Sequence, residues 1–200
     1  SVFSIIYSNT ENAYTVFSID TGDEEVICTG HLPDLNEGES VVLTGSFHLH
    51  PVYGRQFNVE VYEKALPSDT ESMERYLASG VIKGIGLKMA GRIIERFGSQ
   101  SFEVIENYPE KLAEIRGLSL QKAMEISSVF HEQSGQRNTM MFLQNYGISP
   151  NLASKIYKHY KERTEEVLRS NPYDIANTID GVGFKTADGI AYRIGIEPSN

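Results

Sequence analysis

Few of the features that mark secreted, membrane-spanning or disulfide-linked proteins occur in this sequence. Its 200 residues include a single cysteine, Cys28, which excludes an internal disulfide and fits a reducing compartment, with Cys28 as a small core residue. No apolar run approaches the roughly 18 residues that would cross a membrane. The first residues lack the basic start and long apolar stretch of a secretory signal. We therefore expect a cytoplasmic protein that makes no membrane contact.

Basic residues are scarce in the first third of the chain. Residues 1–70 hold eleven Asp or Glu and only two basic residues, Arg55 and Lys64, which gives a net charge of -9. Residues 71–200 hold sixteen acidic and sixteen basic residues and are balanced. A charge step of this kind, where the sequence pattern also changes, marks a domain boundary.

Five segments rich in β-branched and aromatic residues precede Pro67, separated by turn sequences such as DTGD and PDLNEGE. Alternation is expected to place Val41, Leu43 and Phe47 on one face of their strand. Phe57, Val59 and Val61 are likewise expected to share one face of theirs. Five short strands in this length favour a small closed barrel, with an OB-like fold, over residues 1–66. Residues 67–80 then form a linker and a short helix, with Asp69 or Thr70 as its cap.

After Pro67 the apolar period becomes helical and the sequence repeats itself four times. We number the repeats by their glycine turns: turn one at Gly84, turn two at Gly117, turn three at Gly147 and turn four at Gly181. Six positions after each glycine stand Ala90, Ala123, Ala153 and Ala187, and nine positions after it stand Ile93, Ile126, Ile156 and Ile190. Larger apolar residues follow at the thirteenth position, namely Phe97, Phe130, Tyr160 and Ile194. These spacings share one helix face, so each turn opens a helix that packs closely through its alanine.

A second level of repetition joins the turns in pairs. Val104 and Val167 match, as do Pro109 and Pro172, and each pair is 63 residues apart. Two copies of a unit with two helical hairpins are therefore expected, over residues 81–135 and 136–200. The fold class is α+β multi-domain: a five-stranded OB-like barrel followed by an all-α array of two hairpin pairs.

Each turn has the form glycine, apolar residue, then glycine or serine, followed by a helix. The first glycine permits a positive φ, and the new helix presents unpaired N–H groups and the positive end of its dipole. Such a turn can bind a phosphate. The nucleotide-binding alternatives fit poorly, because GVGFKT at turn four has Phe184 between Gly183 and Lys185, and no GK[ST] occurs in the chain.

The pattern resembles the helix-hairpin-helix motif, and its doubling resembles tandem pairs of that motif. The resemblance implies binding to the backbone of duplex DNA without sequence readout, with a hairpin pair across the minor groove. The candidate DNA-contacting residues are Lys83, Gly84, Gly86, Lys88 and Arg92 at turn one, Arg116, Gly117, Ser119 and Lys122 at turn two, and Gly181, Gly183, Lys185 and Thr186 at turn four. We expect the first pair to contact DNA. The second pair is expected to be structural or a docking surface, because Pro150 removes an amide at turn three and Asp180 opposes a phosphate at turn four.

The order of barrel and hairpin pairs is similar to the N-terminal region of the RecD-like helicases of bacteria that lack the RecB and RecC partners, in the exodeoxyribonuclease V alpha-subunit family. The stretches that carry this resemblance include HPVYGRQFNVEVYE, ERYLASGVIKGIGLKMAGRIIERFG and NPYDIANTIDGVGFKTADGIAYRIGI. It implies a parent ATP-dependent 5′→3′ DNA helicase of repair or recombination. ATP and Mg²⁺ would be bound by a helicase domain that follows this region. No catalytic residue and no cofactor are assigned to the chain itself, although such hairpins can hold a monovalent cation on their carbonyls.

Several alternatives remain open. A base-excision glycosylase would use Lys185 after the turn, but the only aspartate that follows is Asp188, one helical turn along. The acidic barrel could stack single-stranded DNA on aromatic rings, or it could contact the helicase domain or another repair protein. The loop residues Tyr53 and Arg55 are our candidates for the protein contact. His48 and His50 share a strand face without an evident third ligand, so we expect no metal site there.

Overall fold

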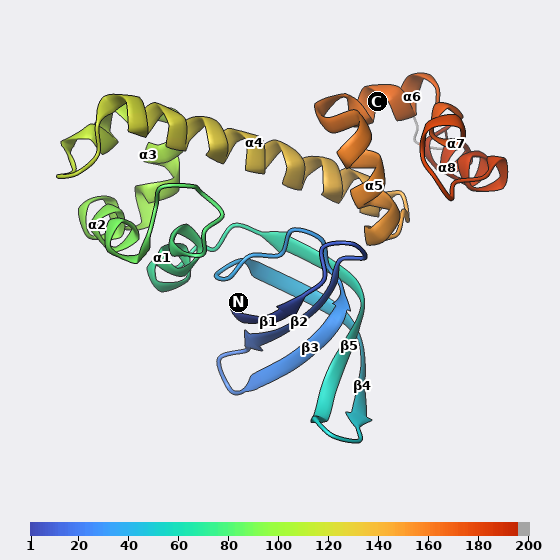
Figure 1. The fold of residues 1–200 in the computed structure, drawn as a ribbon, viewed down its shortest axis with the longest axis horizontal. Coiled ribbons are helices and arrows are strands. Elements are labelled where there is room, and N and C mark those ends of the chain that lie inside the picture. Colours follow the sequence, from blue (N-terminus) through green and yellow to red (C-terminus); the bar gives the residue numbers. More distant parts are fainter. Residues whose placement is uncertain (196–200) are drawn as a thin grey trace. The chain divides into compact units, whose positions relative to one another are not determined.

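The computed structural model describes residues 1–195 (Figure 1). It divides into two compact units, Ser1–Gln133 and Ser134–Asn200, which are described separately. The boundary between them lies within one continuous helix, α4 (Leu120–Asn145). The sequence pattern placed the division between the hairpin pairs at residues 135 and 136, in a polar stretch, and carried no sign that a helix runs through it.

The first unit begins with a five-stranded sheet. Its strands are β1 (Val2–Ser8), β2 (Tyr14–Asp20), β3 (Glu25–His31), β4 (Ser40–His50) and β5 (Gly54–Ala65). Their order in the sheet is β1-β2-β3-β5-β4, and all neighbours are antiparallel except β3 and β5. Val2 donates its amide to the Glu39 carbonyl at 2.9 Å and accepts from the Gly38 amide at 2.8 Å, so β1 closes onto the chain that enters β4. The predicted OB-like fold is confirmed.

The core of this sheet contains Val2, Phe17, Cys28, Leu32 and Tyr62. Cys28 is fully buried there, as the sequence predicted.

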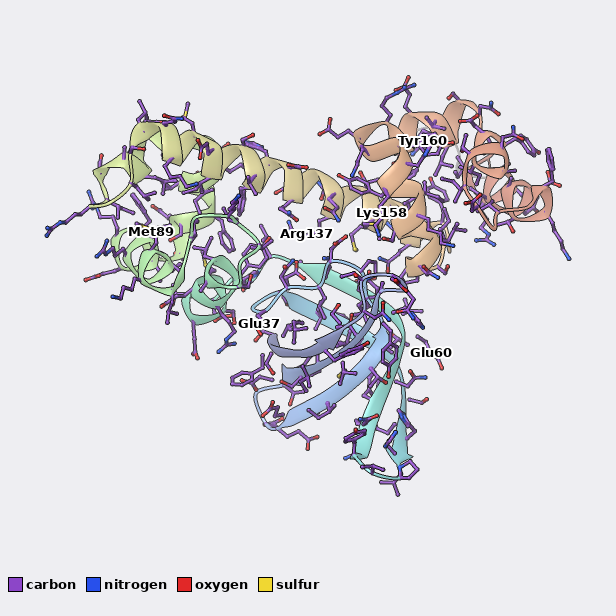
Figure 2. All side chains as sticks on the ribbon, in the orientation of Figure 1. Glu37, Glu60, Met89, Arg137, Lys158 and Tyr160 are labelled. Atoms are coloured by element: carbon purple, nitrogen blue, oxygen red, sulfur yellow. The ribbon has the colours of Figure 1, made fainter. Side chains whose placement is uncertain are left out.

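One expected face in β5 is wrong. The register moves from Thr44↔Val61 to Gly45↔Val59, which leaves Glu60 as an extra residue without a partner in β4. Figure 2 labels Glu60 on β5. A bulge of this kind reverses the alternation of side chains beyond it. Phe57 and Val59 therefore pack on the core, Val61 is 55% exposed, and Tyr62 turns inward at 2% exposure.

The hairpin of β4 and β5 extends beyond the other strands (Figure 1). We call Gly45–Val59 the β-ribbon. It contains no acidic residue, although the sequence up to residue 70 carries a net charge of -9. The Phe47 and Phe57 rings meet edge to face at 5.0 Å, and the Arg55 guanidinium lies 3.8 Å from the centroid of Phe47.

The first unit continues with α1 (Thr70–Ala78), α2 (Leu87–Phe97), α3 (Ser101–Asn107) and the start of α4, with 3-10 turns η1 (Gly98–Gln100) and η2 (Pro109–Glu114). Asp69, one of the two caps expected from the sequence, is the N-cap of α1 and accepts from the Ser72 amide at 2.8 Å. A Cβ on Gly38 would lie 2.5 Å from the Tyr76 nitrogen, so glycine allows the barrel loop to reach α1. Tyr76 and Leu77 of α1 join the core of the first hairpin pair.

The second unit contains the rest of α4, α5 (Pro150–Tyr160), η3 (Lys161–Arg163), α6 (Thr164–Ser170), α7 (Asp174–Thr178) and α8 (Phe184–Gly195). The predicted helix faces are confirmed in both units. Each repeated alanine is 0% exposed, and each repeated isoleucine is at most 2% exposed. A side chain as small as alanine lets the next helix approach closely, and the isoleucines fill the core on either side.

Candidate nucleic-acid interface

Three of the glycine turns share one local geometry. Their glycines have positive φ angles of 95° at Gly84, 97° at Gly117 and 83° at Gly181. In each, the residue after the glycine donates its amide to the carbonyl three positions earlier: Ile85 to Ile82 at 3.2 Å, Leu118 to Ile115 at 3.1 Å, and Val182 to Ile179 at 3.1 Å. A four-residue turn of this type requires a positive φ at its third position, which explains the glycine.

Turn three is built differently. The Ile148 amide donates to the Leu143 carbonyl at 3.1 Å, and the Gly147 amide donates to Gln144 at 2.8 Å. This pair of bonds is a Schellman motif, in which glycine ends the preceding helix. Turn three is therefore the end of α4 joined to α5, and its match to the other turns in sequence hides a different backbone.

The turns also differ in the residue that caps the helix that follows them. Ser119 Oγ accepts from the Lys122 amide at 3.2 Å, and Ser149 Oγ accepts from Leu152 at 3.4 Å. The caps at turns one and four are Gly86 and Gly183, which have no side chain to occupy an amide. Turns two and three therefore satisfy one helix N–H with a side-chain cap, and turns one and four do not.

Turn one leaves the most amides open. Among the residues that the structure describes, no acceptor faces the amides of Gly86, Leu87, Lys88 or Met89. At turn four the Thr186 amide already donates to the Gly183 carbonyl at 3.0 Å. At turn three Pro150 has no N–H at all. A phosphate oxygen accepts hydrogen bonds best where donors and positive charge converge, and these differences favour turn one.

The predicted cations at turns one and two are brought together. Lys83, Lys88, Arg92 and Arg116 are exposed, and Lys122 is partly exposed. A Cβ on Gly84 would lie 2.6 Å from Lys122 Nζ, so the lysine after turn two lies over turn one. Reciprocally, Arg92 after turn one donates from Nη1 to the Arg116 carbonyl at turn two, at 3.0 Å. The two turns therefore lie side by side.

One acidic side chain, Glu125, forms an ion pair with a lysine of this cluster. Lys122 Nζ lies 3.2 Å from Glu125 Oε2. Because both groups are partly exposed, this ion pair contributes little to stability, and a stronger anion can displace the carboxylate.

The predicted residues at turn four lie on the surface of the second unit. Gly181, Gly183, Lys185 and Thr186 are all exposed, and so is Asp180 at the mouth of the turn. Nothing lies within 4 Å of a Cβ placed on Gly181 or Gly183. The turn is open, but its carboxylate opposes an anion.

Arg193 is a residue that sequence reasoning missed. From α8 it donates through Nη1 to the carbonyls of Tyr146 and Gly147, at 2.8 and 3.0 Å. It thus holds turn three much as Arg92 holds turn two. Arg96 stands at the same distance of twelve positions from Gly84, but it pairs with Glu114 at 2.9 Å, so the spacing gave no sign of this contact.

Asp188, the aspartate that a glycosylase mechanism would need, is held by a neighbour. Its hydrogen bond with Tyr173 raises the pKa of that phenol. Residues 1–195 contain no group of three or more His, Cys, Asp or Glu side chains that could hold a metal ion. Within the same residues no helix is both long enough and apolar enough to cross a membrane.

Comparisons with known proteins agree with this domain order. Residues 1–67 match the family model of the OB-fold domain of the ATP-dependent DNA helicase YrrC, and residues 132–200 match that of the ATP-dependent RecD2 DNA helicase HHH domain. Residues 75–128 match the SAM-like helix-hairpin-helix tandem. The ATP-dependent RecD2 DNA helicase of Deinococcus radiodurans is 27% identical over 169 residues, which are 83% of this chain and 23% of that protein. The chain is therefore similar to the N-terminal region of the RecD-like DNA helicases, with an OB-fold domain followed by helix-hairpin-helix domains.

Proposed function

We propose that this region grips the backbone of duplex or forked DNA, without reading its sequence, for an ATP-dependent 5′→3′ helicase of repair or recombination. The observation that carries the proposal is turn one: four open amides at the start of α2, flanked by the exposed Lys83 and Lys88. Backbone amides and lysines recognise phosphates and are indifferent to base identity. Turn two, which lies beside turn one, supplies Arg116 and the partly exposed Lys122.

The second unit has a lesser role in this proposal. Turn three offers few donors, and turn four offers Lys185 and Thr186 next to Asp180. We assign the second pair to structure and docking. With two to four phosphates neutralised by the first pair, binding to duplex DNA is weak and salt-sensitive, with a Kd on the order of 10⁻⁴–10⁻⁶ M.

The cofactors of the parent reaction are assigned elsewhere. ATP and Mg²⁺ require a phosphate loop with a lysine and a metal-binding hydroxyl in fixed positions, and GVGFKT at turn four does not have that spacing. ATP hydrolysis therefore belongs, in this proposal, to a helicase domain outside these 200 residues. The carbonyls of an open hairpin can accept a monovalent cation beside the phosphate.

The test is binding of residues 1–200 to labelled duplex, forked and single-stranded DNA over a series of salt concentrations. Replacing Lys83 and Lys88 by alanine should weaken duplex binding about tenfold for all sequences alike. It should also reduce the slope of log K against log salt by about two, because each lysine neutralises one phosphate. A double variant that binds like the wild type at low salt contradicts the assignment.

A matched control comes from α5. Lys155 and Lys158 are exposed and lie three positions apart, and their replacement by alanine removes the same charge from the second hairpin pair. This variant should keep the affinity and the slope of the wild type. Equal weakening by both variants would mean that binding depends on general charge rather than on turn one.

A second candidate function is protein docking through the β-ribbon. Leu49, Val52 and Tyr53 are 79%, 77% and 74% exposed, and Leu49 pairs with Arg55 across the ribbon. Exposed apolar side chains gathered in one segment mark an interaction surface. We assign this surface to the helicase domain of the same protein, with another repair protein as the alternative partner.

Docking is tested by titrating residues 1–200 with the separately produced remainder of a full-length parent. Val52→Ser with Tyr53→Ser should weaken that association about tenfold, because two apolar side chains no longer pack against the partner. His48→Ser, in β4 four residues before Val52, is the control and should have no effect, because it removes no apolar side chain from this surface. Unchanged association in the first variant rejects the ribbon as the docking surface.

A further inference from the structure

An apolar side chain stands at the first position of the helices after three of the glycine turns, and it is exposed rather than packed in a core. Leu87 follows turn one and is 72% exposed, and Leu120 follows turn two and is 56% exposed. Phe184 takes the same place after turn four and is 65% exposed. The first turn of a helix ordinarily favours acidic or polar residues, which complement its dipole and face water.

Isolated exposed leucines are common on protein surfaces and usually need no explanation. These differ because they recur at one structural position in three of the four repeated turns: GIGLK, GLSLQ and GVGFK. In each case the preceding residue is glycine or serine, and the apolar residue before that one is at most 7% exposed. The fold therefore buries one apolar side chain of the turn and leaves the next one outside.

The position of these leucines indicates which part of the DNA they contact. The amides of Gly86, Leu87 and Lys88 have no acceptor within the described residues, and turns one and two lie side by side through Lys122 and Gly84. A phosphate held on those amides brings its own sugar next to the side chain at the first helical position, because consecutive Cα atoms are only about 3.8 Å apart. In a DNA duplex the wall beside the phosphate in the minor groove is the deoxyribose ring, which is apolar.

We propose that Leu87 and Leu120 pack against deoxyribose in the minor groove of a DNA duplex, one leucine on each strand, and so supply an apolar, salt-independent part of the affinity. This inference rests on the proposed function, because it requires the first hairpin pair to bind duplex DNA. It adds a recognition element of a different chemistry, which favours DNA over RNA. An RNA duplex presents a polar 2′-hydroxyl at the edge where DNA presents a C–H group.

The test compares two double variants of residues 1–200 on a labelled DNA duplex over a salt series. Leu87→Ser with Leu120→Ser should weaken binding about tenfold or more at every salt concentration, because less apolar surface is buried in the complex. The slope of log K against log salt should stay that of the wild type, because every phosphate keeps its partners. The thermal unfolding midpoint should be unchanged, since both side chains are exposed.

The matched control is Val42→Ser with Val61→Ser, which removes two exposed apolar side chains from β4 and β5 in the same unit, outside the β-ribbon. It should bind DNA like the wild type. Equal weakening by both double variants would show a general effect of surface hydrophobicity and would overturn the inference. So would unchanged binding in the leucine variant, or weaker binding accompanied by a changed slope.

An RNA duplex of the same sequence supplies a second readout. The leucine variant and the wild type should bind it equally, so an equal loss of affinity on RNA and DNA would reject the packing against deoxyribose. A wild type that binds no duplex DNA would defeat the proposed function itself. Unaffected binding in the leucine variant, together with a reduced slope in Lys83→Ala with Lys88→Ala, would defeat only the present inference.

Discussion

Gly98 and Lys161 stand 63 residues apart and adopt the same backbone conformation. Gly98 has φ 55° and ψ -133°, and Lys161 has φ 52° and ψ -129°. Three residues later the hydroxyls of Ser101 and Thr164 donate to the carbonyls of Gly98 and Lys161, each at 2.6 Å. The internal repeat therefore extends beyond the turns to the connection between helices, and only one copy has kept the residue that this conformation favours.

Lys161→Gly should stabilise the second unit. A residue other than glycine at this positive φ costs on the order of 1–3 kcal/mol, and the greater entropy of an unfolded glycine offsets about 0.5–1 kcal/mol of that cost. We expect the free energy of unfolding to rise by about 1 kcal/mol, measured by urea unfolding of residues 1–200 with hydrogen exchange of α5 and α6 amides to assign the change to this unit.

Lys158→Gly is the control for that measurement. Lys158 is exposed in the last turn of α5, three positions earlier, where glycine costs up to about 1 kcal/mol relative to a good helix former. The two substitutions should therefore move stability in opposite directions. A loss of stability in both variants would mean that the connection does not strain Lys161.

The sequence predicts those features of the fold whose signal lies in neighbouring residues, and it misses those that depend on distant parts of the chain. Ala90 and Ile93 recur in all four repeats because a helix face is set by spacing alone, and their burial is confirmed. Val61 was misplaced because Glu60 adds one residue to β5, and a bulge depends on the partner strand. Turn three matched the other turns in letters, yet Gly147 ends α4 in a Schellman motif.

The candidate site shows the same limit. The open amides at Gly86 and the Ser119 cap follow from the residue types and could be inferred from sequence. The placement of Lys122 over Gly84 could not, because it depends on how two turns separated by 33 residues pack together. Arg193 has the spacing of Arg96, which pairs with Glu114 instead, so its bonds to turn three emerge only from the three-dimensional structure.

Cys28 should report unfolding of the barrel. The thiol is fully buried, and burial raises its pKa to about 12, so almost none of it is the reactive thiolate at pH 8. We expect a disulfide reagent at pH 8 to label Cys28 only as fast as the barrel opens, and rapidly in denaturing urea. Rapid labelling of the folded protein would show that the strand β3 is accessible.

Asp69 should make the stability of α1 depend on pH. Its hydrogen bond from the Ser72 amide lowers the pKa of the carboxyl below the ordinary value of 3.8. The charged cap therefore stabilises the fold above pH 3.8, and this contribution is lost as the pH falls through the lower, folded-state pKa. Asp69→Ala should cost about 1 kcal/mol at pH 7, and Asp69→Asn should cost less, because asparagine also caps helices.

The measurement is urea unfolding of the wild type and both variants from pH 7 to pH 2. The difference between the wild type and Asp69→Asn should shrink at the acid end of this range, because protonation removes the charge on which it depends. A difference that is independent of pH would mean that the carboxylate charge has no part in capping α1.

Gly86→Ser should weaken DNA binding and raise the stability of the protein. Gly86 has an extended backbone, with φ -97° and ψ -178°, and a Cβ there meets nothing within 4 Å, so serine fits without strain. Its hydroxyl can accept from the Met89 amide, as Ser119 accepts from Lys122. The new cap should add a few tenths of a kcal/mol to the free energy of unfolding. It should also occupy one amide of turn one and weaken binding to duplex DNA about tenfold.

Ser119→Gly is the reciprocal change and separates the role of the amides from that of the fold. It removes the cap of α4, so stability should fall slightly, while one more N–H at turn two is freed for a phosphate. If open amides hold DNA, this variant binds duplex at least as tightly as the wild type although it is less stable, and Gly86→Ser binds less tightly although it is more stable. Affinities that follow stability in both variants would mean that DNA binding reflects the rigidity of the first hairpin pair rather than its free donors. Binding isotherms on duplex DNA at two salt concentrations, paired with urea unfolding of the same preparations, decide between these outcomes.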